Sequence, residues 1–185
     1  MAGASGSRSQ GKGRSNKHLT ARAADLVALV CGSGGSRIPG TALVPWLTGL
    51  NLVWEFAQLP LYAIGSDVPV PYIEYYVMHC TVGDMLIGAG SIVLALLMLQ
   101  VRRLREWRWP RILALTVLFG VTYTGFSEWM NTVVEESWQY AERMPTLALG
   151  GFKLGLSPIA QWLLVPPIAL HLARFAFHST RSGPR

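Results

Sequence analysis

Residues 75–100 read YYVMHCTVGDMLIGAGSIVLALLMLQ, a segment with no Lys or Arg and with Asp84 as its one acidic residue. As an α-helix it would be about 39 Å long, enough to cross the roughly 30 Å hydrocarbon core of a bilayer. The whole chain is 51% hydrophobic and 14% charged, whereas soluble domains are about 25% charged. We therefore expect an integral membrane protein and exclude a soluble enzyme.

Three further segments on either side of this one reach about 20 mainly apolar residues, the length of a membrane-spanning helix. The four expected spans are residues 41–62, 75–100, 111–131 and 154–177. Proline residues fall in or next to the segments that connect them, where helices end. The sequence therefore predicts an all-α fold, a polytopic membrane four-helix bundle made by residues 39–178.

The two ends of the chain differ from this domain. Residues 1–38 are rich in Gly, Ser and basic residues, and the first 24 hold too few apolar side chains to offset chain entropy. We expect a disordered basic arm at 1–38 and a short tail at 179–185, both cytoplasmic.

The basic residues alternate between the expected connections. Fourteen of the 16 Lys and Arg residues lie in the N-terminal arm, between the second and third spans, or at the C-terminal end, and only Arg143 and Lys153 lie elsewhere. Positively charged flanks remain in the cytoplasm. This pattern predicts a multi-pass plasma-membrane protein with both termini cytoplasmic. It also accounts for the net charge of +6, so we expect no nucleic-acid partner.

The connection between the third and fourth spans is expected on the outer side. It contains the string EESWQYAE at residues 135–142. We expect these residues to form a short helix along the outer surface.

Three carboxylates lie inside the expected spans, namely Glu55, Asp84 and Glu128. Each costs about 2.5–3.5 kcal/mol at the centre of a membrane helix, so their presence needs an explanation. Polar side chains accompany each of them at helical spacing, which gives every span one polar face. These faces are Asn51-Glu55-Gln58, His79-Gly83 with Asp84 next to it, Thr124-Glu128-Asn131, and Ser157-Gln161. We expect them to face inward and to meet in the outer half of the bundle.

Two interpretations of this polar set remain open. It could hold the helices together, or it could form an acid–base site. In the second interpretation the catalytic residues are Glu55, Asp84, Glu128 and His79, with His79 as a proton shuttle. The residues that would bind polar groups of a substrate are Asn51, Gln58, Asn131, Gln161, Trp138 and Tyr140. We expect no metal and no cofactor.

Six strings carry a resemblance to a known family. They are NLVWEFAQLPLY (51–62), HCTVGD (79–84), SEWMN (127–131), WQY (138–140), MP (144–145) and GLSPIAQW (155–162). On these strings residues 41–175 resemble a family of small bacterial four-span inner-membrane proteins with no assigned activity. The resemblance implies the same topology and no particular chemistry.

The sequence leaves three functions to compare. The first is a non-catalytic membrane component or assembly subunit with an outward-facing polar cluster. The second is a membrane-embedded acid–base enzyme that acts on a lipid or isoprenoid. The third is a transporter. The expected partners are membrane lipids and either a second copy of the chain or a membrane partner protein.

Overall fold

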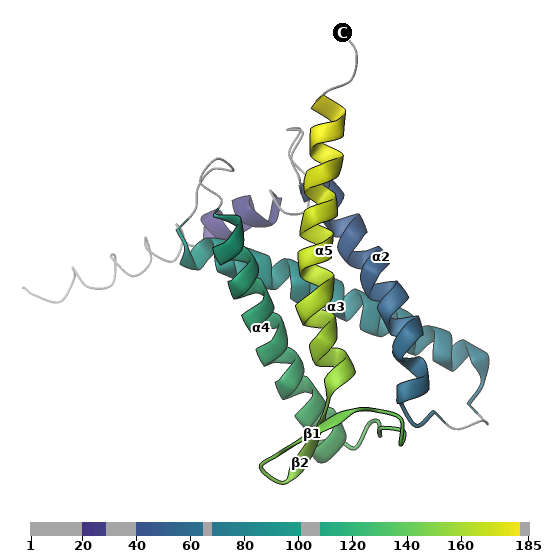
Figure 1. The fold of residues 1–185 in the computed structure, drawn as a ribbon. Helices are drawn as coiled ribbons and strands as arrows, with labels where there is room; N and C mark the ends of the chain where they lie inside the picture. The colour runs from purple at the N-terminus through teal and green to yellow at the C-terminus, as the bar shows by residue number, and fades with distance from the viewer. Residues whose placement is uncertain (1–19, 29–39, 65–67, 101–107, 182–185) are drawn as a thin grey trace, which may run out of the picture.

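The computed structural model describes residues 20–28, 40–64, 68–100 and 108–181. The described chain is mostly helical and carries one small sheet (Figure 1). Its elements are α2 (Gly40–Gln58), the 3-10 helix η1 (Leu59–Leu61), α3 (Val70–Met98), α4 (Trp109–Trp129), the π-helix η3 (Met130–Val134), β1 (Thr146–Leu149), β2 (Phe152–Gly155) and α5 (Leu156–Arg181).

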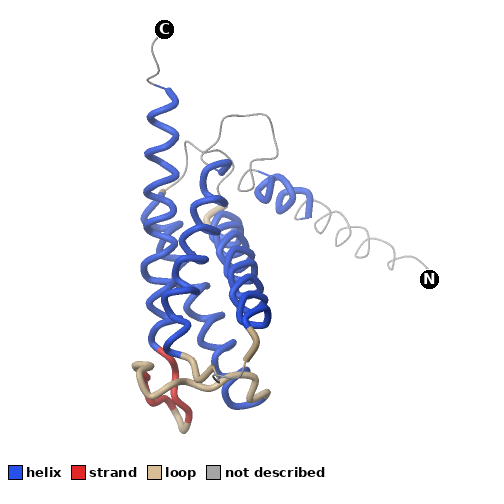
Figure 2. Tube along the Cα trace, turned by 90° about the vertical axis from the view of Figure 1, so that its right-hand side faces the viewer, coloured by secondary structure: helices blue, strands red, loops and turns tan. Residues whose placement is uncertain are grey.

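The four long helices pack in a ring. Helix α2 contacts α3 and α5, and α4 contacts the same two helices. Figure 1 shows α2, α4 and α5 running alongside one another, whereas α3 crosses them obliquely. Loops and strands gather at one end of this arrangement (Figure 2), which we call the hairpin end. We call the opposite end, where α4 begins after Arg108, the basic end.

Three of the helical segments are long and apolar enough to cross a membrane, namely Val70–Met98, Trp109–Val134 and Leu156–Ala173. Helix α2, the expected first span, is not among them. Its inner face carries buried Asn51, Glu55 and Gln58, which lower its overall hydropathy, while Val53 and Phe56 are exposed on its outer face. The structure therefore supports a multi-pass membrane protein with three such helices.

The expectation of an all-helical chain was wrong between α4 and α5. Strands β1 and β2 pair antiparallel, with Thr146 opposite Gly155 and Leu149 opposite Phe152. Gly150 and Gly151 make the turn with φ angles of +52° and +99°, values that glycine adopts without steric cost. The expected helix at 135–142 is also absent, because helical structure ends at Val134 and an extended loop follows.

Residues 20–28, expected to lie within the disordered arm, form a helix. Leu26 on this helix is 5% exposed and packs into the main apolar cluster. The rest of the expected arm lies outside the described part of the chain. The same holds for residues 182–185 of the expected tail.

The main apolar cluster fills the half of the molecule towards the basic end. Successive long helices run in opposite directions, so the beginnings of α2 and α4 lie beside the last parts of α3 and α5. These parts build most of the cluster. Its members are Leu26, Leu43, Leu47, Ile92, Ala95, Leu96, Ile112, Val165, Ala169, Leu170 and Ala173. The buried polar side chains are concentrated in the other half, so the core divides into two zones along its length.

Candidate functional site: a buried polar cluster

Six polar side chains from three helices meet in the half of the core towards the hairpin end. They are Asn51, Glu55 and Gln58 of α2, Asp84 of α3, and Ser157 and Gln161 of α5, and we call them the polar cluster. The α2 members are 2–7% exposed and Gln161 is 3% exposed. The helical spacing along α2 places its three members on one face, which points to α5 and α3.

Gln161 links three helices through one amide group. Its Nε2 atom lies 2.7 Å from Oδ2 of Asp84, 3.0 Å from Oδ1 of Asn51 and 3.4 Å from Oε1 of Glu55. A primary amide has two hydrogens to donate, so the three acceptors share them. The Gln161 side chain therefore holds α5 to both α2 and α3.

Gln58 extends the cluster towards the hairpin end. Its Nε2 donates to Oε1 of Glu55 at 2.8 Å, and its Oε1 accepts from Oγ of Ser157 at 3.0 Å. The carboxyl groups of Glu55 and Asp84 also interact with each other.

Glu128 of α4 belongs to a second group at the hairpin end. Its carboxylate accepts a hydrogen bond from the hydroxyl of Tyr140, which itself accepts from the backbone N–H of Gly155 at 3.0 Å. Burial and then the hydrogen bond to Glu128 raise the pKa of Tyr140 above its usual range. Tyr140 therefore keeps its proton at physiological pH and acts as the donor.

Two further aromatic residues surround Glu128. The hydroxyl of Tyr62 and the indole N–H of Trp138 are directed towards its carboxylate, although the buried Trp138 Nε1 does not reach hydrogen-bonding geometry. The Tyr62 ring contacts the rings of both Trp138 and Tyr140.

Backbone hydrogen bonds fix the loop that carries Tyr140. Ala63 N–H donates to Gln139 O at 2.9 Å, and Ala141 N–H donates to Leu61 O at 3.0 Å. The loop after η3 is therefore tied to the end of α2, and it crosses the hairpin end of the helices.

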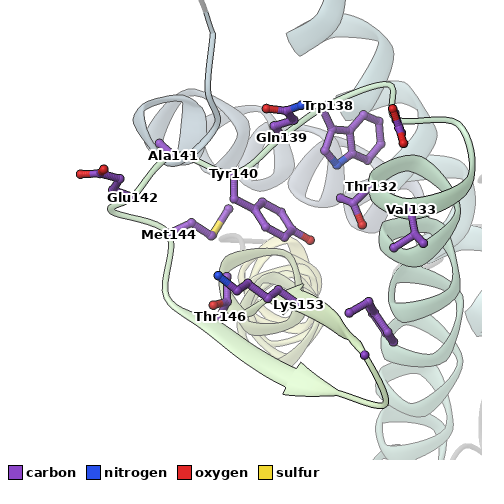
Figure 3. A pocket seen from close by; sticks show the side chains of 13 residues that line it. Thr132, Val133, Trp138, Gln139, Tyr140, Ala141, Glu142, Met144, Thr146 and Lys153 are labelled. Carbon is purple, nitrogen blue, oxygen red and sulfur yellow. The ribbon is translucent and has the colours of Figure 1, made fainter.

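A pocket of about 680 Å³ lies at the hairpin end, outside the polar cluster (Figure 3). Tyr140 and Trp138 form part of its wall, and Glu136, Glu142 and Lys153 supply its charged side chains. The remaining lining residues are Thr132, Val133, Gln139, Ala141, Met144, Thr146, Gly151 and Phe152. The three buried carboxylates are not among the lining residues, but Tyr140, which lines the pocket, donates a hydrogen bond to Glu128.

The structure brings together eight of the ten residues that the sequence suggested for a site, in two groups. Asn51, Glu55, Gln58, Asp84 and Gln161 lie in the polar cluster, and Glu128, Trp138 and Tyr140 lie in the second group. His79 is exposed and stacks on Tyr75 with ring centroids 5.8 Å apart. Asn131 donates to Ser127 O of its own helix at 2.8 Å.

Two residues that were not among the ten candidates also join these groups. Ser157 joins the polar cluster, and its spacing of four residues from Gln161 was the signal in the sequence. Tyr62 joins the second group, and its position next to Trp138 and Tyr140 depends on the path of the loop, which no local pattern reveals. Among the described residues, no group of three or more His, Cys, Asp or Glu side chains could hold a metal ion.

Comparison with known proteins gives no relative: the chain matches no protein-family model, no curated protein and no solved structure.

Proposed function

We propose that the chain is a non-catalytic integral membrane component, either an assembly factor or a subunit of a larger complex. In this proposal the polar cluster holds α2, α3 and α5 together. The observation that carries it is the position of Gln161, whose amide donates to side chains of two other helices. Each carboxylate of the cluster thereby accepts a hydrogen bond from a neighbouring helix. Neither carboxylate lines the pocket.

We further propose that all four long helices cross a bacterial inner membrane, with both termini on the cytoplasmic side. The outward face of α2 exposes Trp46, Val53 and Phe56, which suits contact with lipid. Helix α3 has 29 residues and is therefore about 44 Å long, longer than the roughly 30 Å hydrocarbon core. A tilted path such as the one in Figure 1 accommodates this excess.

The partners in this proposal contact the outward faces of the helices. Large apolar side chains such as Leu86 of α3, Leu118 of α4 and Leu163 of α5 are 54–61% exposed there. Membrane lipids, a second copy of the chain or a membrane partner protein would cover them.

The experiment that tests the proposal uses the amide variants Glu55→Gln, Asp84→Asn and Glu128→Gln, with Glu135→Gln at an exposed position as control. If the carboxylates only hold helices, an amide retains most hydrogen bonds. All variants should then match the wild type in abundance, melting temperature and the lipid and metabolite profile of a complemented deletion strain. A folded, abundant Glu55→Gln or Asp84→Asn protein that fails to restore the profile would overturn the proposal.

The second candidate is an acid–base enzyme that acts on a lipid or isoprenoid, and one observation favours it. Tyr140 forms part of the wall of the pocket and also donates to Glu128, so a ligand in the pocket would be one side chain away from a buried carboxylate. In this candidate Glu55 and Asp84 act as the acid and the base. A Glu128→Gln protein of unchanged abundance that fails to restore the lipid and metabolite profile of the deletion strain would favour this candidate.

A transport function, the third candidate, has less support. It would require polar side chains through the half towards the basic end, where the described helices pack the apolar cluster around Ile92, Leu96 and Ile112.

A further inference from the structure

The inference concerns Arg22, on the helix at residues 20–28. Arg22 precedes Leu26 by four residues, so both side chains lie on the same face of this helix. Leu26 packs into the apolar cluster with Ile92 and Ile112. Arg22 therefore points towards the bundle at the basic end, where Figure 1 places this helix beside the start of α4 and the end of α3.

Two nitrogen atoms of the Arg22 guanidinium lack an acceptor among the described residues. Its Nε and Nη2 atoms are buried, and no residue in the described part of the chain accepts a hydrogen bond from either of them. Asp25, the acidic residue of the same helix, is exposed. A buried donor without a partner destabilises the fold, and more so when the group is charged, so this arrangement calls for an acceptor beyond the described residues.

The two orphaned atoms define the chemistry of that acceptor. Nε and one terminal nitrogen of a guanidinium form a planar pair of parallel donors, which matches two oxygens of a phosphate or carboxylate. A neutral acceptor would satisfy one donor and leave the charge unpaired. An anion with two oxygens satisfies both.

The surroundings point to a membrane headgroup. Apolar Leu26 and Leu113 lie on the inner side, whereas Arg108 and Arg111 are exposed at the start of α4. A tryptophan, Trp109, lies between these two arginines, as is common where a helix meets the headgroups. Positive charge at this depth attracts anionic lipids.

We propose that Arg22 binds the phosphate of an anionic phospholipid at the basic end, with Arg108 and Arg111 adding positive charge around it. The site is independent of the proposed function. Arg22 as a whole is partly exposed, and in the proposed complex its side chain turns so that the two nitrogens face the phosphate.

The test measures the melting temperature of the full chain in detergent, alone and with equal mole fractions of phosphatidylglycerol or phosphatidylcholine. We expect phosphatidylglycerol to raise the melting temperature of the wild type more than phosphatidylcholine does. The Arg22→Gln variant should lose at least half of that difference. Arg143→Gln, which removes an exposed arginine at the hairpin end, should keep it.

Two further measurements make the test specific. Arg22→Lys keeps the charge and loses the paired donors, so it should show a response between those of the wild type and Arg22→Gln. Without lipid, Arg22→Gln should melt at the wild-type temperature or above it, since it removes an unpaired charge.

Three results would overturn the proposal. The first is a full phosphatidylglycerol response in Arg22→Gln. The second is a lower melting temperature of Arg22→Gln without lipid, which would reveal an acceptor within the protein. The third is an equal stabilisation by inorganic phosphate alone, which would identify a free anion in place of a lipid.

Discussion

A β-carbon at Gly120 would lie 2.1 Å from Cε3 of the Trp162 indole. Trp162 is 2% exposed and also approaches Gly88, where a β-carbon would lie 3.8 Å from its Cη2 atom. The indole thus fills the space between α3 and α4, at the border between the polar cluster and the apolar cluster. Glycine at position 120 is what allows α4 to approach α5 this closely.

The first prediction concerns this contact. Gly120→Ala forces the indole or the helix to move, and overpacking of this kind costs about 1–3 kcal/mol. We expect a clear fall in the melting temperature of the purified protein. Gly125→Ala on the same helix is the matched control, because nothing lies within 4 Å of a β-carbon there. Equal melting temperatures for the two variants would contradict this packing.

The second prediction concerns the link between helices. Gln161→Met keeps the length of the side chain but removes the donor to Asn51 and Asp84. Buried acceptors that lose their donor cost about 1–3 kcal/mol, so the melting temperature should fall. Thr122→Ala is the control, since this exposed hydroxyl bonds to Leu118 O of its own helix. A variant as stable as the wild type would show that the amide does not hold the helices.

The third prediction concerns the loop at the hairpin end. Tyr140→Phe removes the hydroxyl that joins Glu128 to the Gly155 N–H, which should cost about 1–3 kcal/mol. Because the loop is then less firmly held, trypsin should cleave after Arg143 faster than in the wild type. Tyr123→Phe, an exposed tyrosine of α4, should leave the cleavage rate unchanged. Equal rates in all three proteins would refute a holding role for Tyr140.

The fourth prediction concerns orientation. In a chain whose own cysteines are replaced by serine, Glu142→Cys should react with a membrane-impermeant maleimide on intact cells. Arg108→Cys should react only after the cells are permeabilised. Both positions are exposed in the structure, so access to the reagent depends on the side of the membrane. The reverse pattern would place the hairpin end in the cytoplasm.

The long helices could be predicted from the sequence because uninterrupted apolar length is a local property. The hairpin at 146–155 was not predicted. Its sequence does contain a hairpin signal, Gly150-Gly151 between two short apolar runs. These runs merge with the apolar start of α5, and the prediction extended that helix back to residue 154.

The candidate site could be predicted only in part. Spacing along one helix identifies its polar face, which is why Asn51, Glu55 and Gln58 were found together. Spacing does not say which other helix that face meets. His79 precedes Asp84 by five residues, yet its side chain stacks on Tyr75 at the surface. Glu128 pairs with a loop residue, which depends on the path of the chain after η3.

The hydrogen bonds between α2 and α5 have a consequence for how the protein is made. Ser157 and Gln161 bond to α2 side chains that precede them by 99 and 110 residues in the chain. At synthesis rates of about 5–20 residues per second, α5 reaches the membrane about 5–20 s after α2 does. In the proposed topology, α2, which is not among the three segments apolar enough to cross a membrane by themselves, therefore enters first and waits for its partner. Retention of the nascent chain at the insertion machinery, rather than immediate release of each helix into lipid, suits such an order.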